Sequence, residues 1–315
     1  MAGITTSATD KPVVEVDARA EETAPMLKIW IDGKLVDKDQ AKVSVFDHGL
    51  LYGDGCFEGI RVYGGRIFKF RSHLERMYRS AEKIRLKPAY TLEEVDKATR
   101  ETVAANNLVD AYIRLVFSRG AGDLGLNPFN CPKPCTIIIA DKIQLYPPEF
   151  YETGVAVVVA DRPRIPIACL DPAIKSLNYL NNILAKTEAI EAGVLEAIML
   201  NTEGFVSECT GDNLFFVKHG KVLTPPTDAG ILHGITRQFV IDDVAPACGY
   251  QVEEKMMRIE EVLEADEVFL TGTAAEIIGV TKIDDKVMSA GKVGPITRKF
   301  NEEFRRRVKE GAPED

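Results

Sequence analysis

The chain of 315 residues carries a net charge of −9, and its composition, 45% hydrophobic and 28% charged, is ordinary for a globular protein. The acidic excess argues against a protein that binds a nucleic-acid backbone, and no apolar run approaches the roughly 20 residues that cross a membrane. Six cysteines without the paired spacing of a metal site indicate reduced thiols and a cytoplasmic protein, and the length suits two domains.

The first 25 residues lack the apolar segment of a signal peptide and are predicted to form a disordered tail, so that the ordered chain starts at Met26. Two hairpins follow. The first turns at Asp32-Gly33 between alternating apolar residues, and the second turns at Gly64-Gly65. The chain therefore opens with antiparallel strands.

Two helices and two more strands complete the first half. Serine or threonine followed three residues later by glutamate forms a capping box, and this pattern at residues 72–75 and 91–94 predicts two helix starts. Apolar-rich runs at 111–118 and 135–140 predict strands. We therefore expect a small α/β domain at residues 26–145.

A proline-containing segment without periodicity, residues 141–154, is the expected linker to a larger domain at residues 146–315. The helix after residue 180 should end at Gly193, because glycine favours the position that follows a helix. Further strands are predicted at 154–160, 196–201, 205–208, 213–223 and 267–274, and further helices at 234–249 and 294–311. The two halves together predict an α+β fold of two domains.

Two charged residues of the second half stand among apolar neighbours. Lys175 lies in DPAIKSLNYLNNILAKTEAI, and this pattern alone favours an ordinary lysine whose stem crosses an apolar surface. Glu208 lies in FVSECTGDNLFF, between an apolar strand and a turn, where a carboxylate is costly unless it is paired. A ligand that pairs with both residues would give them a common purpose.

Two turns could bind the phosphate group of such a ligand. Backbone N–H groups of Ile235 and Thr236 open a helix, and the turn at 271–273 offers further donors. Arg76, which lies off the apolar stripe of its helix, could complete the cradle. Each turn alone is equally well an ordinary helix cap or strand turn. The run GAGDLG at 120–125 is not a dinucleotide site, because prolines follow it where that site needs a helix.

A lysine, a buried acid and a phosphate cradle are together the set that pyridoxal 5'-phosphate (PLP) requires. The lysine forms an imine with the cofactor aldehyde, and the acid keeps the ring nitrogen protonated so that the ring can accept electrons. The cradle holds the 5'-phosphate. Tyr179, four residues after Lys175, could hydrogen-bond the ring oxygen O3′.

The order Lys175, Glu208, Asn213, then LHGITR and TGTAAE, resembles the class IV (fold-type IV) aminotransferases. HGLLYGDGCFEGIR and HLER in the first half continue the resemblance, which covers the chain from about residue 27 to its end. It implies a two-domain fold like that of D-amino acid aminotransferase, with the active site at the domain interface. PLP is the implied cofactor.

The resemblance also implies roles for individual residues. Lys175 matches the lysine that forms the Schiff base and carries the proton between the substrate Cα and C4′, and Glu208 matches the partner of the ring nitrogen. Tyr179 matches the O3′ tyrosine, although some relatives place it five residues after the lysine. The matching phosphate ligands are Arg76, Ile235, Thr236 and Thr273. The backbone amides of Thr273 and Ala274 match the holder of the substrate α-carboxylate.

Within the class, the chain is most similar to the branched-chain amino acid aminotransferases. The matching substrate-pocket residues are Tyr52, Phe57, Gly59, Arg61, Tyr112 and Arg114, and Leu124, Gly125 and Leu126 match a loop that a neighbouring subunit supplies. Apolar walls would hold leucine, isoleucine or valine, and Arg114 with Tyr52 would reach the second carboxylate of glutamate. Without the lysine site, Arg114 would be a strand-face ion pair and the aromatic residues plain core.

The implied reaction is a ping-pong transfer of the amino group from a branched-chain L-amino acid to 2-oxoglutarate, in a homodimer or larger homo-oligomer. The expected partners are therefore amino acids and 2-oxo acids, with no nucleic acid and no membrane. D-amino acid aminotransferase and 4-amino-4-deoxychorismate lyase would share Lys175 and Glu208, so both remain alternatives. A non-catalytic protein that kept the scaffold is a third.

Overall fold

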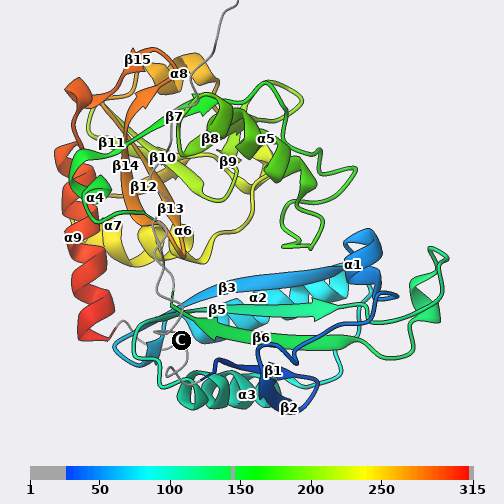
Figure 1. Cartoon of the computed structure of the whole chain (residues 1–315). Coiled ribbons are helices and arrows are strands. Elements are labelled where there is room, and N and C mark those ends of the chain that lie inside the picture. Colours follow the sequence, from blue (N-terminus) through cyan, green and yellow to red (C-terminus); the bar gives the residue numbers. More distant parts are fainter. Residues whose placement is uncertain (1–25, 143–145, 312–315) are drawn as a thin grey trace, which may run out of the picture.

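The computed structural model describes residues 26–142 and 146–311, which form two β-sheets with helices packed against them (Figure 1). The predicted tail at 1–25 lies outside the described residues, as do residues 143–145 of the predicted linker. Strands of the first sheet end at Asp141 and those of the second begin at Val155. Among the described residues, no helix has the length and apolar character to span a membrane.

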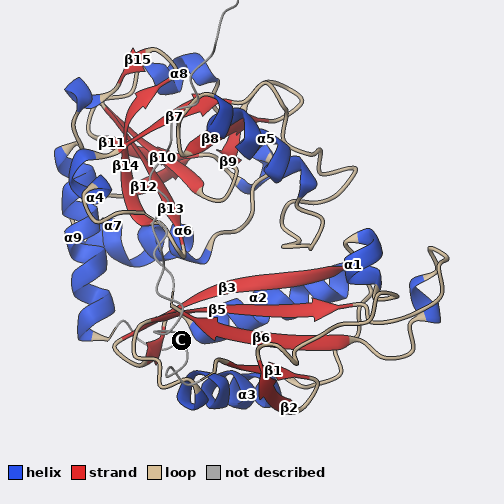
Figure 2. Ribbon diagram, viewed as in Figure 1, coloured by secondary structure: helices blue, strands red, loops and turns tan. Residues whose placement is uncertain are grey.

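The first sheet has six strands in the order β2-β1-β6-β5-β3-β4, and every neighbouring pair is antiparallel (Figure 2). Its strands are β1 (Lys28–Ile31), β2 (Lys34–Asp37), β3 (Gly55–Tyr63), β4 (Arg66–Ile67), β5 (Ala111–Ser118) and β6 (Cys135–Asp141). The hairpins at Asp32-Gly33 and Gly64-Gly65 are confirmed. Asp32 has a φ of 44° and the three glycines also have positive φ, as a tight hairpin turn requires.

Helices α2 (Phe70–Lys83) and α3 (Leu92–Ala105) pack against this sheet. The capping box that opens α3, with Thr91 and Glu94, is confirmed. The predicted start of α2 is wrong, because the helix begins two residues before Ser72. Phe70, which is 2% exposed, packs in the core as the first residue of the helix.

The second sheet has nine strands, eight of them in the order β12-β11-β10-β13-β14-β7-β8-β9, with β15 beside β14. Its strands are β7 (Val155–Val159), β8 (Glu196–Leu200), β9 (Val206–Cys209), β10 (Asn213–Lys218), β11 (Lys221–Thr224), β12 (Val252–Glu254), β13 (Glu267–Gly272), β14 (Glu276–Ile283) and β15 (Lys286–Val287). The hairpin strands β10 and β11, and the strand β13, agree with the sequence prediction. The central strand β14 was not predicted; it follows β13 after a short turn, and Gly279 interrupts its apolar run.

The helices of the second half cover this sheet. They are α4 (Phe150–Thr153), α5 (Leu180–Glu191), α6 (Ile235–Phe239), α7 (Ala245–Ala247), α8 (Ile259–Leu263) and α9 (Pro295–Glu310). Gly193, with a φ of 75°, follows α5 as predicted. The predicted helix at 234–249 is one helical run, but a π-helical segment, Val240–Val244, joins α6 to α7. Pro246, which cannot donate a backbone hydrogen bond, follows this change of winding.

Backbone hydrogen bonds join the segment that carries Lys175 to the first sheet. The N–H of Phe57 donates to the carbonyl of Lys175 at 2.9 Å, and the N–H of Leu177 donates to the carbonyl of Gly55 at 2.9 Å. These bonds make residues 175–177 an extension of the small sheet at the start of β3. The lysine thus lies where the two sheets meet.

A second junction lies at the other end of β3. The buried carboxylate of Glu276, at the start of β14, accepts a hydrogen bond from the Tyr63 hydroxyl at 3.1 Å and one from Arg305 of α9 at 3.2 Å. Arg61 lies 3.9 Å from the same carboxylate. This cluster ties β3, β14 and α9 together.

Candidate active site

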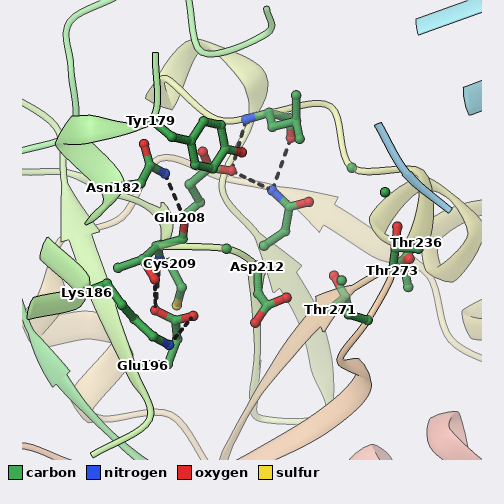
Figure 3. Close-up of a pocket in the computed structure, with 18 of the residues that line it drawn as sticks. Tyr179, Asn182, Lys186, Glu196, Glu208, Cys209, Asp212, Thr236, Thr271 and Thr273 are labelled. Atoms are coloured by element: carbon green, nitrogen blue, oxygen red, sulfur yellow. Dashed lines mark hydrogen bonds and ion pairs between the residues drawn. The ribbon is translucent and has the colours of Figure 1, made fainter. Parts of the chain in front are cut away.

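A cavity of about 560 Å³ lies between the two sheets and is lined by residues of both. Gly59, Arg76 and Tyr112 reach it from the small sheet and from α2. The second half contributes the predicted residues Lys175, Tyr179, Glu208, Ile235, Thr236, Thr273 and Ala274. Ten of the residues from the second half are labelled in Figure 3.

The Lys175 amine lies in this cavity rather than on an open surface. Its Nζ is 3.1 Å from the Tyr179 hydroxyl and 4.7 Å from the centre of the Phe57 ring. The two aromatic rings contact each other edge to face, with centroids 5.0 Å apart. The lysine is therefore held beside a single hydroxyl partner, with an aromatic wall behind it, which is a suitable setting for an amine nucleophile.

The Glu208 carboxylate is 5% exposed and accepts three hydrogen bonds. Arg164 donates to Oε1 from Nε at 3.0 Å and its Nη2 forms an ion pair with the same oxygen at 2.9 Å, while Oε2 accepts from Asn213 Nδ2 and the Leu232 N–H, both at 3.0 Å. Burial raises the pKa of Glu208, and the charge and hydrogen bonds of Arg164 partly offset this rise. Arg164 was not predicted, because it lies among prolines in DRPRIP, a run without periodicity.

Arg76 is fixed by a second buried carboxylate. Its Nε and Nη2 each donate to Glu58 at 2.7 Å, and its Nη1 donates to the carbonyl of His233 at 2.6 Å. Burial opposes ionisation of Glu58, but the charges and hydrogen bonds of Arg76 and His73 hold the pKa of that carboxyl well below its usual range. Three of the five guanidinium N–H groups are thus engaged, which leaves two for an anion.

Two of the predicted phosphate ligands, Thr236 and Thr273, are drawn in Figure 3 on the side of the pocket away from Tyr179. Thr236 is on α6 and Thr273 is in the turn after β13, and both line the cavity. Gly234, which precedes α6, must be glycine, because a Cβ there would lie 1.9 Å from Asn213 Oδ1. The nearby Thr271 Oγ1 is buried and has no partner among the described residues. Free N–H groups, hydroxyls and an arginine suit a phosphate group.

Three predicted substrate residues lie next to the lysine as one connected group. The Arg114 guanidinium lies 4.6 Å from the centre of the Phe57 ring and donates to the Tyr112 hydroxyl at 3.3 Å. A Cβ at Gly59 would lie 1.9 Å from the same hydroxyl, so only glycine allows Tyr112 to reach the cavity in this way.

Five of the predicted substrate residues are not among those that line this cavity. Two of them, Phe57 and Arg114, contact residues that do, Lys175 and Tyr112. Arg61 is held at the Glu276 junction, where it also stacks 4.8 Å from the centre of the Tyr63 ring. Tyr52 is 37% exposed and donates to the carbonyl of Leu124, while Leu126 is 79% exposed. The position of Arg61 gives no support to its predicted pocket role. Tyr52 and Leu126 face outward from the chain.

Tyr146 and Asp212 are among the cavity-lining residues that sequence reasoning missed. Asp212 is 7% exposed and lies against Gly272, whose Cβ would meet its Oδ1 at 1.9 Å. Burial and the charge of Glu196 raise the pKa of Asp212 to about 7, although Lys186 and Lys175 act in the opposite direction. The run CTGDN contains Asp212, but nothing in the pattern marks it as buried.

Asp212→Asn should change the pH dependence of stability. A carboxyl with a raised pKa binds more protons in the folded state, so the free energy of unfolding falls as pH rises between 3.8 and about 7. The variant lacks this loss, and its stability relative to the parent should increase from about pH 5 to about pH 8. Urea unfolding at both values measures this. The exposed Asp285→Asn is the control, and a stability difference that does not vary with pH would contradict the expectation.

Comparison with known proteins agrees with this geometry. The model of the class IV amino-transferase family matches residues 55–283. A protein of Methanocaldococcus jannaschii, named provisionally as a branched-chain-amino-acid aminotransferase, is 49% identical over 279 residues, which is 89% of this chain and 96% of that protein.

Solved structures give the same result. The branched-chain aminotransferase of Thermoproteus uzoniensis with norvaline is 41% identical, with a TM-score of 0.85 over 91% of this chain and 97% of that one. The PLP form of the branched-chain amino acid aminotransferase of Thermobaculum terrenum is 32% identical, with a TM-score of 0.83 over 93% and 96%. These findings confirm the α+β fold and the PLP cofactor predicted from the sequence, and the chain belongs to the class IV aminotransferase family.

Proposed function

We propose that the protein is a PLP-dependent transaminase that moves the amino group of branched-chain L-amino acids to 2-oxoglutarate by a ping-pong mechanism. The observation that carries the proposal is the arrangement of one cavity, in which the Lys175 amine, the Glu208 carboxylate and a set of phosphate donors face a common space. The names of the similar proteins support the choice of branched-chain substrates.

Each predicted cofactor residue of the cavity has a task in this proposal. PLP, when bound, supplies a ring that stabilises negative charge at the substrate Cα. Lys175 Nζ holds the cofactor between turnovers, and afterwards moves the Cα proton. Tyr179 orients that amine, and Glu208 faces the pyridine nitrogen. Arg76, Ile235, Thr236 and Thr273 hold the phosphate, which fixes the ring relative to Lys175.

The substrate residues meet two different demands. The Phe57 ring and the apolar walls bury the side chain of leucine, isoleucine or valine, at about 0.8 kcal/mol for each CH₂ removed from water. The amides of Thr273 and Ala274 hold the α-carboxylate common to all substrates. Arg114 reaches the second carboxylate of glutamate, with the Tyr112 hydroxyl as its partner in place of the expected Tyr52.

A second subunit completes the site in this proposal. The Tyr52 hydroxyl bonds to the carbonyl of Leu124, and the exposed side chains of Leu124 and Leu126 suit insertion into a neighbouring cavity. Several large apolar side chains nearby are also exposed, namely Val45, Leu50 and Phe129. Burial of these side chains in a homodimer would remove apolar surface from water. A cytoplasmic location stays a prediction.

Lys175→Ala should abolish transamination and the absorbance that the bound cofactor gives near the visible edge, because it removes the amine that is bonded to the Tyr179 hydroxyl in the cavity. Spectra of the purified protein and an amino-donor panel of L-leucine, D-alanine and aminodeoxychorismate measure this and separate the two alternatives on the same fold. Lys218→Ala, which alters a lysine paired with Glu264 outside the cavity, is the control. Turnover in Lys175→Ala would remove the mechanism, and a parent protein that stays colourless with added PLP would favour a non-catalytic scaffold.

Arg114→Ala should lower kcat/KM for glutamate and 2-oxoglutarate more than kcat/KM for leucine. Loss of a charge-assisted hydrogen bond to the second carboxylate costs about 1.5–3 kcal/mol, or roughly tenfold to a hundredfold in kcat/KM. Leucine has no such carboxylate, so kcat/KM for leucine should fall less. Steady-state kinetics with both donors measure the ratio, and equal losses would mean that Arg114 only supports Phe57 and Tyr112.

Leu126→Asp should weaken the homodimer and lower activity together, because the aspartate would carry a charge into an apolar contact. Analytical ultracentrifugation across protein concentration, together with activity at the same concentrations, measures both effects. Leu35→Asp, on the exposed strand β2, is a matched control. A monomeric parent protein with full activity would exclude the partner loop.

A further inference from the structure

We propose that Arg164 is a positioning residue that fixes the Glu208 carboxylate as an anion in one orientation, and that Asn182 in turn fixes Arg164. The inference deepens the proposed function and rests on its placement of Glu208 against the pyridine nitrogen. Arg164 does not line the cavity, so it acts through Glu208 rather than by touching a ligand.

The first step is the contact between the two charges. Arg164 and Glu208 are each 5% exposed. Both guanidinium contacts, the hydrogen bond from Nε at 3.0 Å and the ion pair from Nη2 at 2.9 Å, go to the same oxygen, Oε1. The other oxygen is left to the Asn213 amide and the Leu232 N–H. Because the two oxygens have different partners, a rotation of the carboxylate would break the ion pair and all three hydrogen bonds.

The second step is a count of lone pairs. A carboxylate has about four acceptor positions, and three hydrogen bonds occupy Glu208, which leaves one position for a pyridinium N–H. A group held in this way is a weaker base than a free buried carboxylate, because each donor favours the anion. A proton shared between Glu208 and a pyridine nitrogen therefore stays on the nitrogen. Of the three groups that donate to Glu208, namely Arg164, Asn213 and the Leu232 N–H, Arg164 alone also brings a positive charge.

The third step is the support of Arg164 itself. Its Nη1 donates to Asn182 Oδ1 at 3.0 Å, and Asn182 Nδ2 donates to the carbonyl of Thr210 at 2.8 Å. Thr210 lies two residues after Glu208, so the contacts close a ring that begins on β9 and ends at the residue that follows this strand. Asn182 lies in the first turn of α5, shortly after Tyr179.

The neighbouring Asn181 holds the backbone on both sides of Arg164. Its Oδ1 accepts from the Ile165 N–H at 3.0 Å, and its Nδ2 donates to the carbonyl of Pro163 at 3.0 Å. The asparagine pair in LNYLNN, to which no role was given above, thus has one purpose. It places an arginine from the segment after β7 against the acid of β9.

Arg164→Met tests the inference, because methionine keeps the length of the side chain and removes its charge and donors. We expect PLP affinity, measured by titration of the cofactor-free protein, to fall on the order of tenfold to a hundredfold. The pH midpoint of the absorbance of the bound cofactor should shift, and kcat should fall more than KM rises. Arg162→Met, two residues away on the surface with Glu188 as its partner, should match the parent protein.

Asn182→Ala provides a second test that leaves both charges in place, and it keeps the inference testable if Arg164→Met does not fold. It should shift PLP affinity and the absorbance midpoint in the same direction by a smaller factor. Arg164→Lys, which keeps the charge but lacks the contact of two guanidinium nitrogens with Glu208, should retain more of the PLP affinity than Arg164→Met. Unchanged PLP affinity and an unchanged absorbance midpoint in Arg164→Met, or in Asn182→Ala if that variant alone folds, would overturn the inference. A parent protein that fails to bind PLP would instead overturn the proposed function.

Discussion

The backbone pairing between residues 175–177 and the start of β3 is the constraint on which the site depends. It attaches Lys175 to the small sheet, although the lysine belongs to the second half of the sequence. Glu208 and the phosphate turns belong to the large sheet. The amine and the acid therefore face each other only while the two sheets are docked, and the packing of the whole molecule sets the geometry of the cavity.

Buried charges around the cavity occur in pairs, and this pairing decides what remains for a ligand. A buried charge is costly unless it has a partner of opposite sign with good hydrogen bonds. Glu58 neutralises Arg76, and Arg164 neutralises Glu208, so neither pair adds net charge to the protein interior. Asp212 has no such arginine, and burial keeps its carboxyl partly protonated near neutral pH. The field in the cavity thus comes from oriented donors more than from free ions.

The sequence was sufficient where local chemistry decides the structure. The Asp32-Gly33 turn, the capping box of α3 and the glycine after α5 each depend on neighbours within a few residues. The motif-bearing residues Lys175, Tyr179 and Glu208 line one cavity, and the roles that their specific spacing indicates stay predictions. Residues that depend on distant partners were not: Arg164 meets Glu208 across 44 positions, and Arg61 meets Glu276 rather than the cavity. Nothing near either arginine in the sequence indicates its partner.

The junction at Glu276 has a mechanical consequence. Strand β3 is bonded to the large half of the molecule at both ends, at Gly55 and Phe57 through residues 175–177 and at Tyr63 through Glu276. Two such attachments prevent the halves from sliding past each other. Further contacts join the halves away from these two points, since Arg76 of α2 donates to the carbonyl of His233 and the Phe68 ring packs against Phe239. Because Lys175 is attached at one end of β3, its backbone is tied to the small sheet and would follow that sheet in any shift of the two halves.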